Sequence, residues 1–224
     1  MKKILSLVML FTSLCTSSAC AGNTGKASGQ QQTDSGADRM TSAVSQTDAA
    51  KADKKVLVAF FSHTGENYNV GYIEKGNTHI VAEMIAGETG GELFEIKTVK
   101  PYPEEYRPCT DVAKQEKDSN ARPELQSDIQ VEDFDVIFIG YPNWWGDMPM
   151  AVYTFVEKHD WQGKTVIPFC THEGSGLSDT KQSLEKSCKG SSVLQGLALR
   201  GSVAQKSQDE ARKAVQSWMK KLDF

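Results

Sequence analysis

The amino-acid sequence predicts an α/β fold with an open, doubly wound sheet of five parallel strands. Its apolar runs are continuous rather than alternating, which is typical of strands buried on both faces. Residues 56–61 and 134–140 are the clearest of these runs. Segments with apolar side chains at helical spacing lie between the runs. This alternation indicates parallel strands joined by right-handed crossovers.

The elements follow one another in regular order from residue 54 onward. We expect strands at 56–61, 93–96, 134–140, 164–170 and 193–199, and helices at 77–89, 111–116, 149–158, 177–188 and 207–222. The Gly90-Gly91 pair ends the first helix, and a Ser207–Glu210 capping box begins the last. The last helix should bury a stripe formed by Ala211, Ala214, Val215 and Trp218. Residues 62–76 are interpreted as a long loop.

The N-terminal part of the chain has the pattern of a targeting signal. Residues 1–21 are predicted to be a signal peptide, because Lys2 and Lys3 precede a short apolar run and small residues follow it. Two cleavage sites fit. Cleavage before Cys20 would leave a cysteine that is lipidated as in bacterial lipoproteins, and cleavage after Ala21 would leave a soluble form. An uncleaved membrane anchor is the third alternative.

The remaining residues divide into a linker and a single domain. Residues 22–53 consist mainly of Gly, Ser, Thr, Gln, Ala and Asp, and they have too few large apolar side chains to form a core. They are predicted to be a flexible linker. Residues 54–224 form the folded domain. The predicted location is therefore outside the cytoplasm, as a periplasmic protein or a membrane-anchored lipoprotein.

Charge and cysteine content exclude several classes of function. The formal net charge is -4 and there is no extended basic stretch, which argues against nucleic-acid binding. Cysteines stand at positions 15, 20, 109, 170 and 188, and their spacing matches no zinc motif. No metal site is expected. We interpret Cys109, Cys170 and Cys188 as buried thiols, with one disulfide as the alternative.

The first of three polar loops follows the first strand. Residues 62–65 read Ser-His-Thr-Gly, and Gly76, Asn77 and Thr78 resume the pattern where a helix begins. Hydroxyl groups and glycines at a helix N-terminus can bind a phosphate without Lys or Arg. No nucleotide-triphosphate P-loop motif is present. The alternative is a simple helix cap.

The second and third loops follow the strands at 134–140 and 164–170. Trp144 and Trp145 stand directly after a buried strand, where they can form a stacking platform for a flat aromatic ligand. Their alternative role is to cover the edge of the domain itself. Residues 171–176 are small and polar, and their glycines permit close backbone approach to a ligand. The carboxyl ends of parallel strands share one edge of a sheet, so all three loops should meet there.

These three loops resemble the FMN-binding loops of flavodoxins. The resemblance covers residues 54–224, its most specific part is the Pro-Asn-Trp-Trp-Gly segment at 142–146, and an insertion at 66–75 interrupts the phosphate loop. It implies a flavodoxin-like fold and FMN as cofactor. It leaves open whether Thr64 or Thr78 lies closer to the phosphate. The cofactor-binding residues that it implies are Ser62, His63, Thr64, Gly76, Asn77, Thr78, Pro142, Asn143, Trp144, Trp145, Gly146, Thr171, His172, Glu173, Gly174 and Gly176.

The resemblance implies a redox function. The first hypothesis is electron transfer outside the cytoplasm, with a membrane-associated or periplasmic redox partner. The second is an FMN-dependent oxidoreductase that reduces a quinone or another small substrate. The export signal weighs against this enzyme, because soluble nicotinamide donors are expected inside the cell. The third is a flavodoxin-fold binding module without cofactor, against which the intact aromatic loop argues.

Overall fold

The computed structural model describes residues 54–224, the part of the chain predicted to form the domain. The predicted signal peptide, the lipidation site at Cys20 and the linker lie outside the described residues. Within the described part, no helix is both long and apolar enough to cross a membrane.

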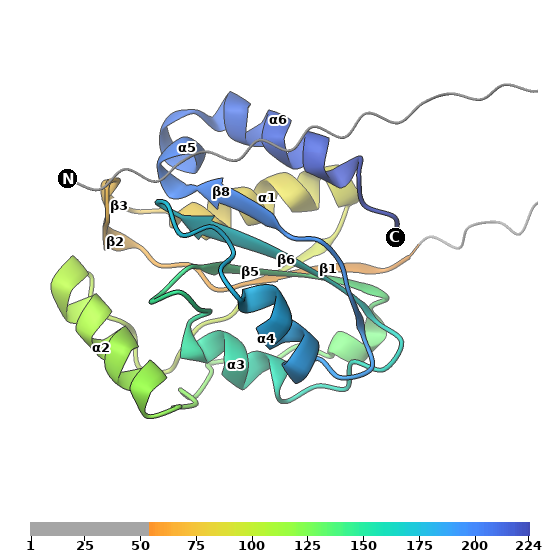
Figure 1. The fold of residues 1–224 in the computed structure, drawn as a ribbon, viewed down its shortest axis with the longest axis horizontal. Coiled ribbons are helices and arrows are strands. Elements are labelled where there is room, and N and C mark those ends of the chain that lie inside the picture. Colours follow the sequence, from red (N-terminus) through yellow and green to blue (C-terminus); the bar gives the residue numbers. More distant parts are fainter. Residues whose placement is uncertain (1–53) are drawn as a thin grey trace, which may run out of the picture. The chain divides into compact units, whose positions relative to one another are not determined.

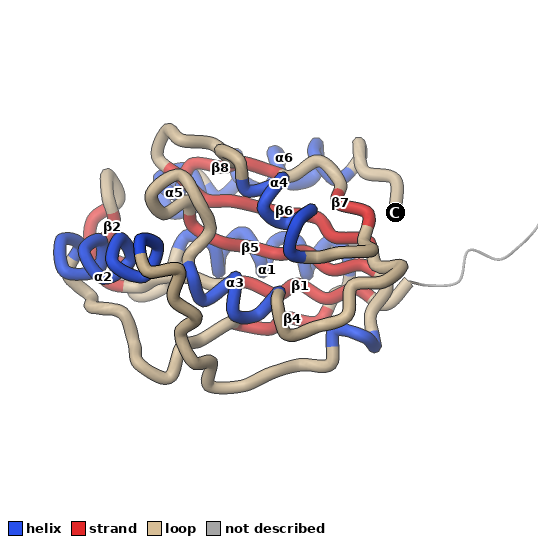
Figure 2. Tube along the Cα trace, turned by 60° about the horizontal axis from the view of Figure 1, so that its bottom comes forward, coloured by secondary structure: helices blue, strands red, loops and turns tan. Residues whose placement is uncertain are grey.

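A parallel sheet forms the centre of the fold, with the strand order β4-β1-β5-β6-β7 (Figure 2). Every pairing in this sheet is parallel, and β8 also pairs with β6. The predicted α/β fold with a doubly wound parallel sheet is therefore confirmed. The strands are β1 (Val56–Phe60), β4 (Glu92–Glu95), β5 (Val136–Pro142), β6 (Thr165–His172), β7 (Ser192–Val193) and β8 (Leu197–Arg200).

Helices cover both faces of the sheet (Figure 1). One layer contains α1 (Asn77–Thr89), α5 (Gly201–Lys206) and α6 (Gln208–Met219), and the other contains α2 (Tyr106–Asp118), α3 (Met150–Val156) and α4 (Thr180–Ser187), with the short 3-10 helix η1 at Val131–Asp133. Side chains that alternate along β1 separate into two apolar clusters. Val58 and Phe60 pack with α1 and α6, whereas Leu57 and Ala59 pack with α3 and α4.

The last predicted strand is interrupted. Residues 193–199 were expected to be continuous, but β7 ends at Val193 and β8 begins at Leu197, so the prediction is wrong at its centre. Pro168 of β6 lies beside this interruption and has no N–H group to donate. A Cβ atom on Gly196 would lie 2.8 Å from the Pro168 carbonyl oxygen, so the two backbones approach unusually closely here.

The last predicted helix, 207–222, corresponds to α6, and the short helix α5 before it was not predicted. Ser207 lies between them with φ -140° and ψ 56°, and its side chain makes no capping hydrogen bond, so the predicted Ser207–Glu210 capping box is wrong. The predicted stripe does face the sheet. Ala211, Val215 and Trp218 are buried, and Ala214 is partly buried against the same cluster.

The predicted end of α1 is confirmed, but a hairpin was missed and α2 was predicted too short. Gly90 ends α1 in the left-handed conformation with φ 67°, as predicted. The interpretation of residues 62–76 as a loop is incomplete, because they contain an antiparallel hairpin of β2 (Gly65–Asn67) and β3 (Gly71–Ile73). Helix α2 is much longer than the predicted 111–116. It buries only Cys109 and Ala113, so its apolar pattern is weak.

Candidate functional site

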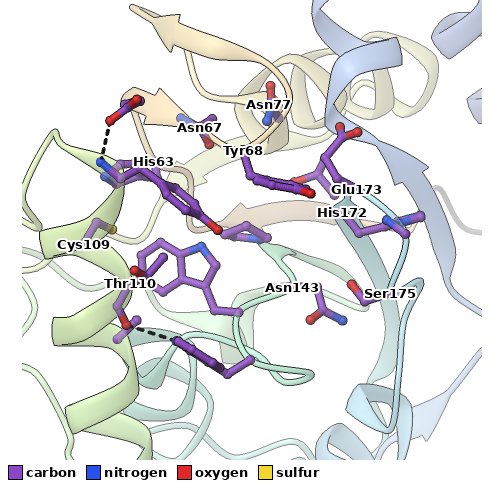
Figure 3. Close-up of a pocket in the computed structure, with 18 residues that line it drawn as sticks. His63, Asn67, Tyr68, Asn77, Cys109, Thr110, Asn143, His172, Glu173 and Ser175 are labelled. Carbon is purple, nitrogen blue, oxygen red and sulfur yellow. Dashed lines mark hydrogen bonds between the residues drawn. The ribbon is translucent and has the colours of Figure 1, made fainter.

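A cavity of about 350 Å³ lies at the carboxyl ends of β1, β5 and β6, where the three polar loops meet (Figure 3). Ten of the predicted site residues line it: His63, Asn77, Pro142, Asn143, Trp144, Trp145, Thr171, His172, Glu173 and Gly174. Six others lie in the same loops but do not line the cavity: Ser62, Thr64, Gly76, Thr78, Gly146 and Gly176.

The first loop is held tightly against the start of α1. The backbone N–H of His79 donates a hydrogen bond to Ser62 Oγ at 3.1 Å, so Ser62 caps the helix from the preceding loop. Gly76 makes this contact feasible, because a Cβ atom there would lie 2.1 Å from Ser62 Oγ. The first N–H groups of a helix have no partner within it, so those of Asn77 and Thr78 remain as donors for an anion.

The two threonines of the first loop have different surroundings. Thr78 is buried, and its hydroxyl is hydrogen-bonded to the hydroxyl of Thr171 at 2.8 Å. This bond joins the first loop to the third. Thr64 is exposed. Of the two threonine hydroxyls, that of Thr64 is therefore the more accessible to a ligand, whereas Thr78 can offer its backbone N–H.

Asn77 lines the cavity and contains an unpaired polar atom. Its side chain lies against Gly201, where a Cβ atom would lie 2.4 Å from Asn77 Nδ2. Its Oδ1 atom is buried and has no hydrogen-bond partner within residues 54–224. A buried acceptor without a partner is costly. A ligand hydroxyl that donates to this atom would remove that cost.

The second loop contains a tight turn at the cavity rim. Trp144 and Asp147 exchange two backbone hydrogen bonds of 2.9 and 3.0 Å. The residues between them, Trp145 and Gly146, have φ values of 55° and 77°, as in a type I′ turn. A positive φ is unfavourable for a residue as bulky as tryptophan, so the surrounding contacts must hold Trp145 in place.

Three side-chain hydrogen bonds supply those contacts. The amide oxygen of Asn143 accepts from the N–H of Gly146 at 3.0 Å. Lys117 of α2 donates to the carbonyl oxygen of Trp145 at 2.7 Å. The indole N–H of Trp145 donates to the carbonyl oxygen of Thr110 at 3.0 Å. Helix α2 therefore positions the tryptophan loop.

The two tryptophans form different parts of the cavity wall. Trp144 is partly buried and makes edge-on contacts with Phe61 and Tyr102, at ring-centroid distances of 5.3 and 5.0 Å. It is a fixed inner wall. Trp145 has 52% of its surface exposed and lies at the outer rim. Trp144 thus packs on the domain, as the edge-covering interpretation expects, and it also lines the cavity.

The third loop is fixed by its own polar groups. Asn143 Nδ2 donates to the Gly176 carbonyl oxygen and to Ser178 Oγ, each at 3.0 Å. The carboxylate of Glu173 accepts from the N–H of Ser202 at 2.6 Å and from its hydroxyl at 3.0 Å. Glu173 therefore binds the first turn of α5.

Both cavity histidines are shifted toward their neutral forms. Burial lowers the pKa of His63, and the hydrogen bond to the Pro103 carbonyl and the charge of Glu104 oppose this shift. Because a carbonyl can only accept, His63 Nε2 carries the proton in that 2.9 Å bond. Burial and the charge of Arg200 lower the pKa of His172, whereas Glu173 opposes the shift. His172 Nδ1 accepts from the N–H of Gly174, so the neutral ring keeps its proton on Nε2.

One side of the cavity is formed by residues that were not among the predicted site residues. Eight further residues line it: Glu66, Asn67, Tyr68, Tyr106, Cys109, Thr110, Ala113 and Ser175. All but Ser175 come from the inserted hairpin and from α2. The tyrosines in these otherwise polar segments were the available signal, because aromatic side chains are unusual in a solvated loop.

The three cysteines in the described part of the chain are free and buried, as predicted, and the disulfide alternative is wrong for them. Burial raises the pKa of the Cys109 and Cys188 thiols to about 12, so both are protonated at neutral pH. Cys109 thus contributes an uncharged side chain to the cavity wall.

The fold and the site define a class of protein: an open α/β domain whose strand ends hold a cavity lined by a helix start and an aromatic wall. The chain belongs to the flavodoxin family, because residues 55–222 match the family model described as flavodoxin. A comparison with curated proteins found no match.

Several solved structures are similar to this domain. A protein from Bacteroides uniformis assigned as a flavoprotein is 31% identical, with a TM-score of 0.59 and coverage of 75% of this chain and 99% of that one. Its counterpart from Bacteroides eggerthii is 30% identical, with a TM-score of 0.58 and coverage of 75% and 96%. A Lactobacillus acidophilus flavoprotein in complex with FMN is 24% identical, with a TM-score of 0.52 and coverage of 65% and 93%, and this likeness concerns the fold alone.

Proposed function

We propose that this protein binds FMN and serves as an electron carrier outside the cytoplasm. The observation that carries the proposal is the meeting of three loops at one cavity in a chain of the flavodoxin family. One loop offers helix N–H groups to an anion, the second offers an aromatic wall, and the third offers polar backbone. The phosphate of FMN suits the first environment, its flat ring suits the second, and the polar edge of that ring suits the third.

The unpaired groups of the site support this fit. The N–H groups of Asn77 and Thr78 and the exposed hydroxyl of Thr64 suit a phosphate. The buried Oδ1 of Asn77 needs a donor, and a hydroxyl of the chain between phosphate and ring can provide one. Trp144 provides a fixed apolar surface for the ring. When bound, FMN supplies one- or two-electron redox chemistry.

The remaining groups of the site position and shield the cofactor. The neutral His172 holds a proton at Nε2, which can be donated to an acceptor in the cavity. The bonds of Asn143 and Glu173 fix the third loop before a ligand arrives, so that less ordering is needed on binding. The partner that we propose is a membrane-associated or periplasmic redox protein.

Turnover measurements separate the carrier from the alternative reductase. The full chain, loaded with FMN, would be mixed with NADPH and a soluble quinone under anaerobic conditions, with free FMN as the control. A carrier should oxidise NADPH no faster than the free FMN control. Rapid, saturable turnover would contradict the carrier and favour an FMN-dependent oxidoreductase. A chain that takes up no FMN would contradict both redox functions. It would favour the third hypothesis, a flavodoxin-fold binding module without cofactor.

We further propose that the protein is exported and anchored through a lipid on Cys20. Lys2, Lys3 and the apolar run that follows them support export, and the small residues before Cys20 support processing there. In a bacterial host, the wild-type chain should be found with the membrane and Cys20→Ser should not. Cys15→Ser is the matched control and should behave as the wild type. Equal fractionation of Cys20→Ser and wild type would contradict the lipid anchor.

A further inference from the structure

We propose that Tyr68, in the inserted hairpin, forms a second aromatic wall for the flavin ring in addition to Trp144. This inference rests on the proposed binding of FMN. It extends the site to a segment outside the three loops and assigns a role to the insertion. The cavity supports it directly, because Tyr68 and its neighbours Glu66 and Asn67 line the same space as Trp144.

The hairpin is held firmly against the start of α2. The N–H of Glu66 donates to the carbonyl oxygen of Glu104 at 2.7 Å, and the Glu66 carboxylate accepts from the N–H of Tyr106 at 3.0 Å. Gly65 permits this approach, because it has φ 84° and a Cβ atom there would lie 2.5 Å from the Glu104 carbonyl oxygen. The hairpin is therefore a positioned wall of the cavity.

Tyr68 stands at the turn of this hairpin with its ring directed over the cavity. The turn closes with a hydrogen bond from the N–H of Val70 to the carbonyl oxygen of Asn67 at 3.1 Å. The ring stacks on Tyr106 with a centroid distance of 6.0 Å and an interplanar angle of 29°. Figure 3 shows Tyr68 reaching toward His172 and Glu173 of the third loop.

The exposure of Tyr68 indicates that its contact with Tyr106 leaves much of the ring uncovered. Its side chain is 58% exposed although it lines a cavity, so much of its ring faces space that a flat ligand would fill. The third loop cannot supply an aromatic surface, since residues 171–176 contain no aromatic ring other than His172. Offset stacking with a large aromatic ligand would bury the apolar surface of Tyr68 and add a directional contact.

Tyr72, in the same hairpin, differs from Tyr68 in its position and its contacts. It is 67% exposed and does not line the cavity. Its hydroxyl donates to the Glu104 carboxylate at 2.9 Å, so Tyr72 attaches the hairpin to the segment that precedes α2. Two tyrosines four residues apart thus have separate roles, and this pair allows stacking to be separated from positioning of the hairpin.

The test measures FMN affinity of the full-length apoprotein by quenching of flavin fluorescence, for wild type, Tyr68→Ala, Tyr68→Phe and Tyr72→Ala. We expect Tyr68→Ala to weaken binding by about ten-fold or more, the order found for loss of one stacked base. The flavin bound to Tyr68→Ala should also be less quenched. Tyr68→Phe retains the ring and should bind within about two-fold of wild type, as should Tyr72→Ala.

Two results would overturn the inference while leaving the proposed function intact. One is wild-type affinity and quenching in Tyr68→Ala. The other is an equal loss in Tyr68→Ala and Tyr68→Phe, because this would show that the hydroxyl matters and the ring does not. A wild-type chain that binds no FMN would instead contradict the proposed function, and this inference with it.

Discussion

Asn143 connects the second and third loops through a single side-chain amide. Its oxygen accepts from Gly146, and its nitrogen donates to Gly176 and Ser178. It thereby holds the turn in which Trp145 adopts a positive φ. The sequence placed Asn143 among the binding residues, but the structure shows that its side chain is already occupied by the protein. Asn143 therefore contributes to binding by holding the second and third loops in position.

Replacement of Asn143 by Ala should weaken FMN binding. The loss leaves the Gly146 N–H and the Gly176 carbonyl without this partner, and removal of a partner from a polar group costs about 1–3 kcal/mol where the group is buried. These groups are near the surface, so we expect the lower part of this range. Titration with FMN measures the effect, with Asn120→Ala as an exposed control. Unchanged affinity in Asn143→Ala would show that the loops keep their positions without it.

His63 makes the stability of the domain depend on pH. Its pKa in the folded state is lowered by burial, so the unfolded state binds more protons as the pH falls below about 6.5. The stabilisation is complete above that pH and decreases as the pH falls through the folded-state pKa. His172 acts with the same sign.

The His63→Gln variant should therefore lose part of this pH dependence. Urea unfolding between about pH 7 and pH 5 should show a smaller decrease in unfolding free energy for the variant than for wild type, with a limit of about 1.4 kcal/mol per pH unit for one proton. Because His172 is present in both proteins, it does not affect the comparison. Parallel curves for the two proteins would mean that His63 titrates as it does in an unfolded chain.

At the scale of elements, the central strands were predictable and the segments around the cavity were not. Strands such as β5 are continuous apolar runs, and such runs are typical of strands buried on both faces of a sheet. Helix α2 buries only two side chains, so its sequence pattern resembles that of a solvated segment. The interruption between β7 and β8 arises from Pro168 in a neighbouring strand, and no local pattern at 194–196 reports that contact.

Two glycines differ in the space available for a side chain. Gly140 lies in β5 beneath the ring of Phe169, and a Cβ atom there would lie 2.0 Å from that ring. Gly140→Ala should therefore reduce the unfolding free energy by about 1–3 kcal/mol through overpacking. Gly87 lies in α1 with open space around it, so Gly87→Ala should increase it by about 0.5–1 kcal/mol. Denaturant unfolding measures both, and a neutral Gly140→Ala would contradict the packing described here.

At the scale of the whole molecule, the site exists because the parallel sheet brings distant loops to one edge. Thr78 and Thr171 are 93 positions apart in the chain, yet their hydroxyls are 2.8 Å apart. The order of strands and loops predicted this meeting. It did not predict that α2 and the hairpin would close the cavity, because their places depend on contacts such as those of Glu66 and Lys117, which no periodicity reveals.

The central claim is that this cavity holds FMN, and identification of the bound cofactor tests it most directly. The full-length protein would be purified without denaturation, its visible spectrum recorded, and the released small molecule identified by mass. We expect flavin absorption and the mass of FMN, at close to one molecule per chain. A colourless protein that remains colourless after incubation with FMN would contradict the account.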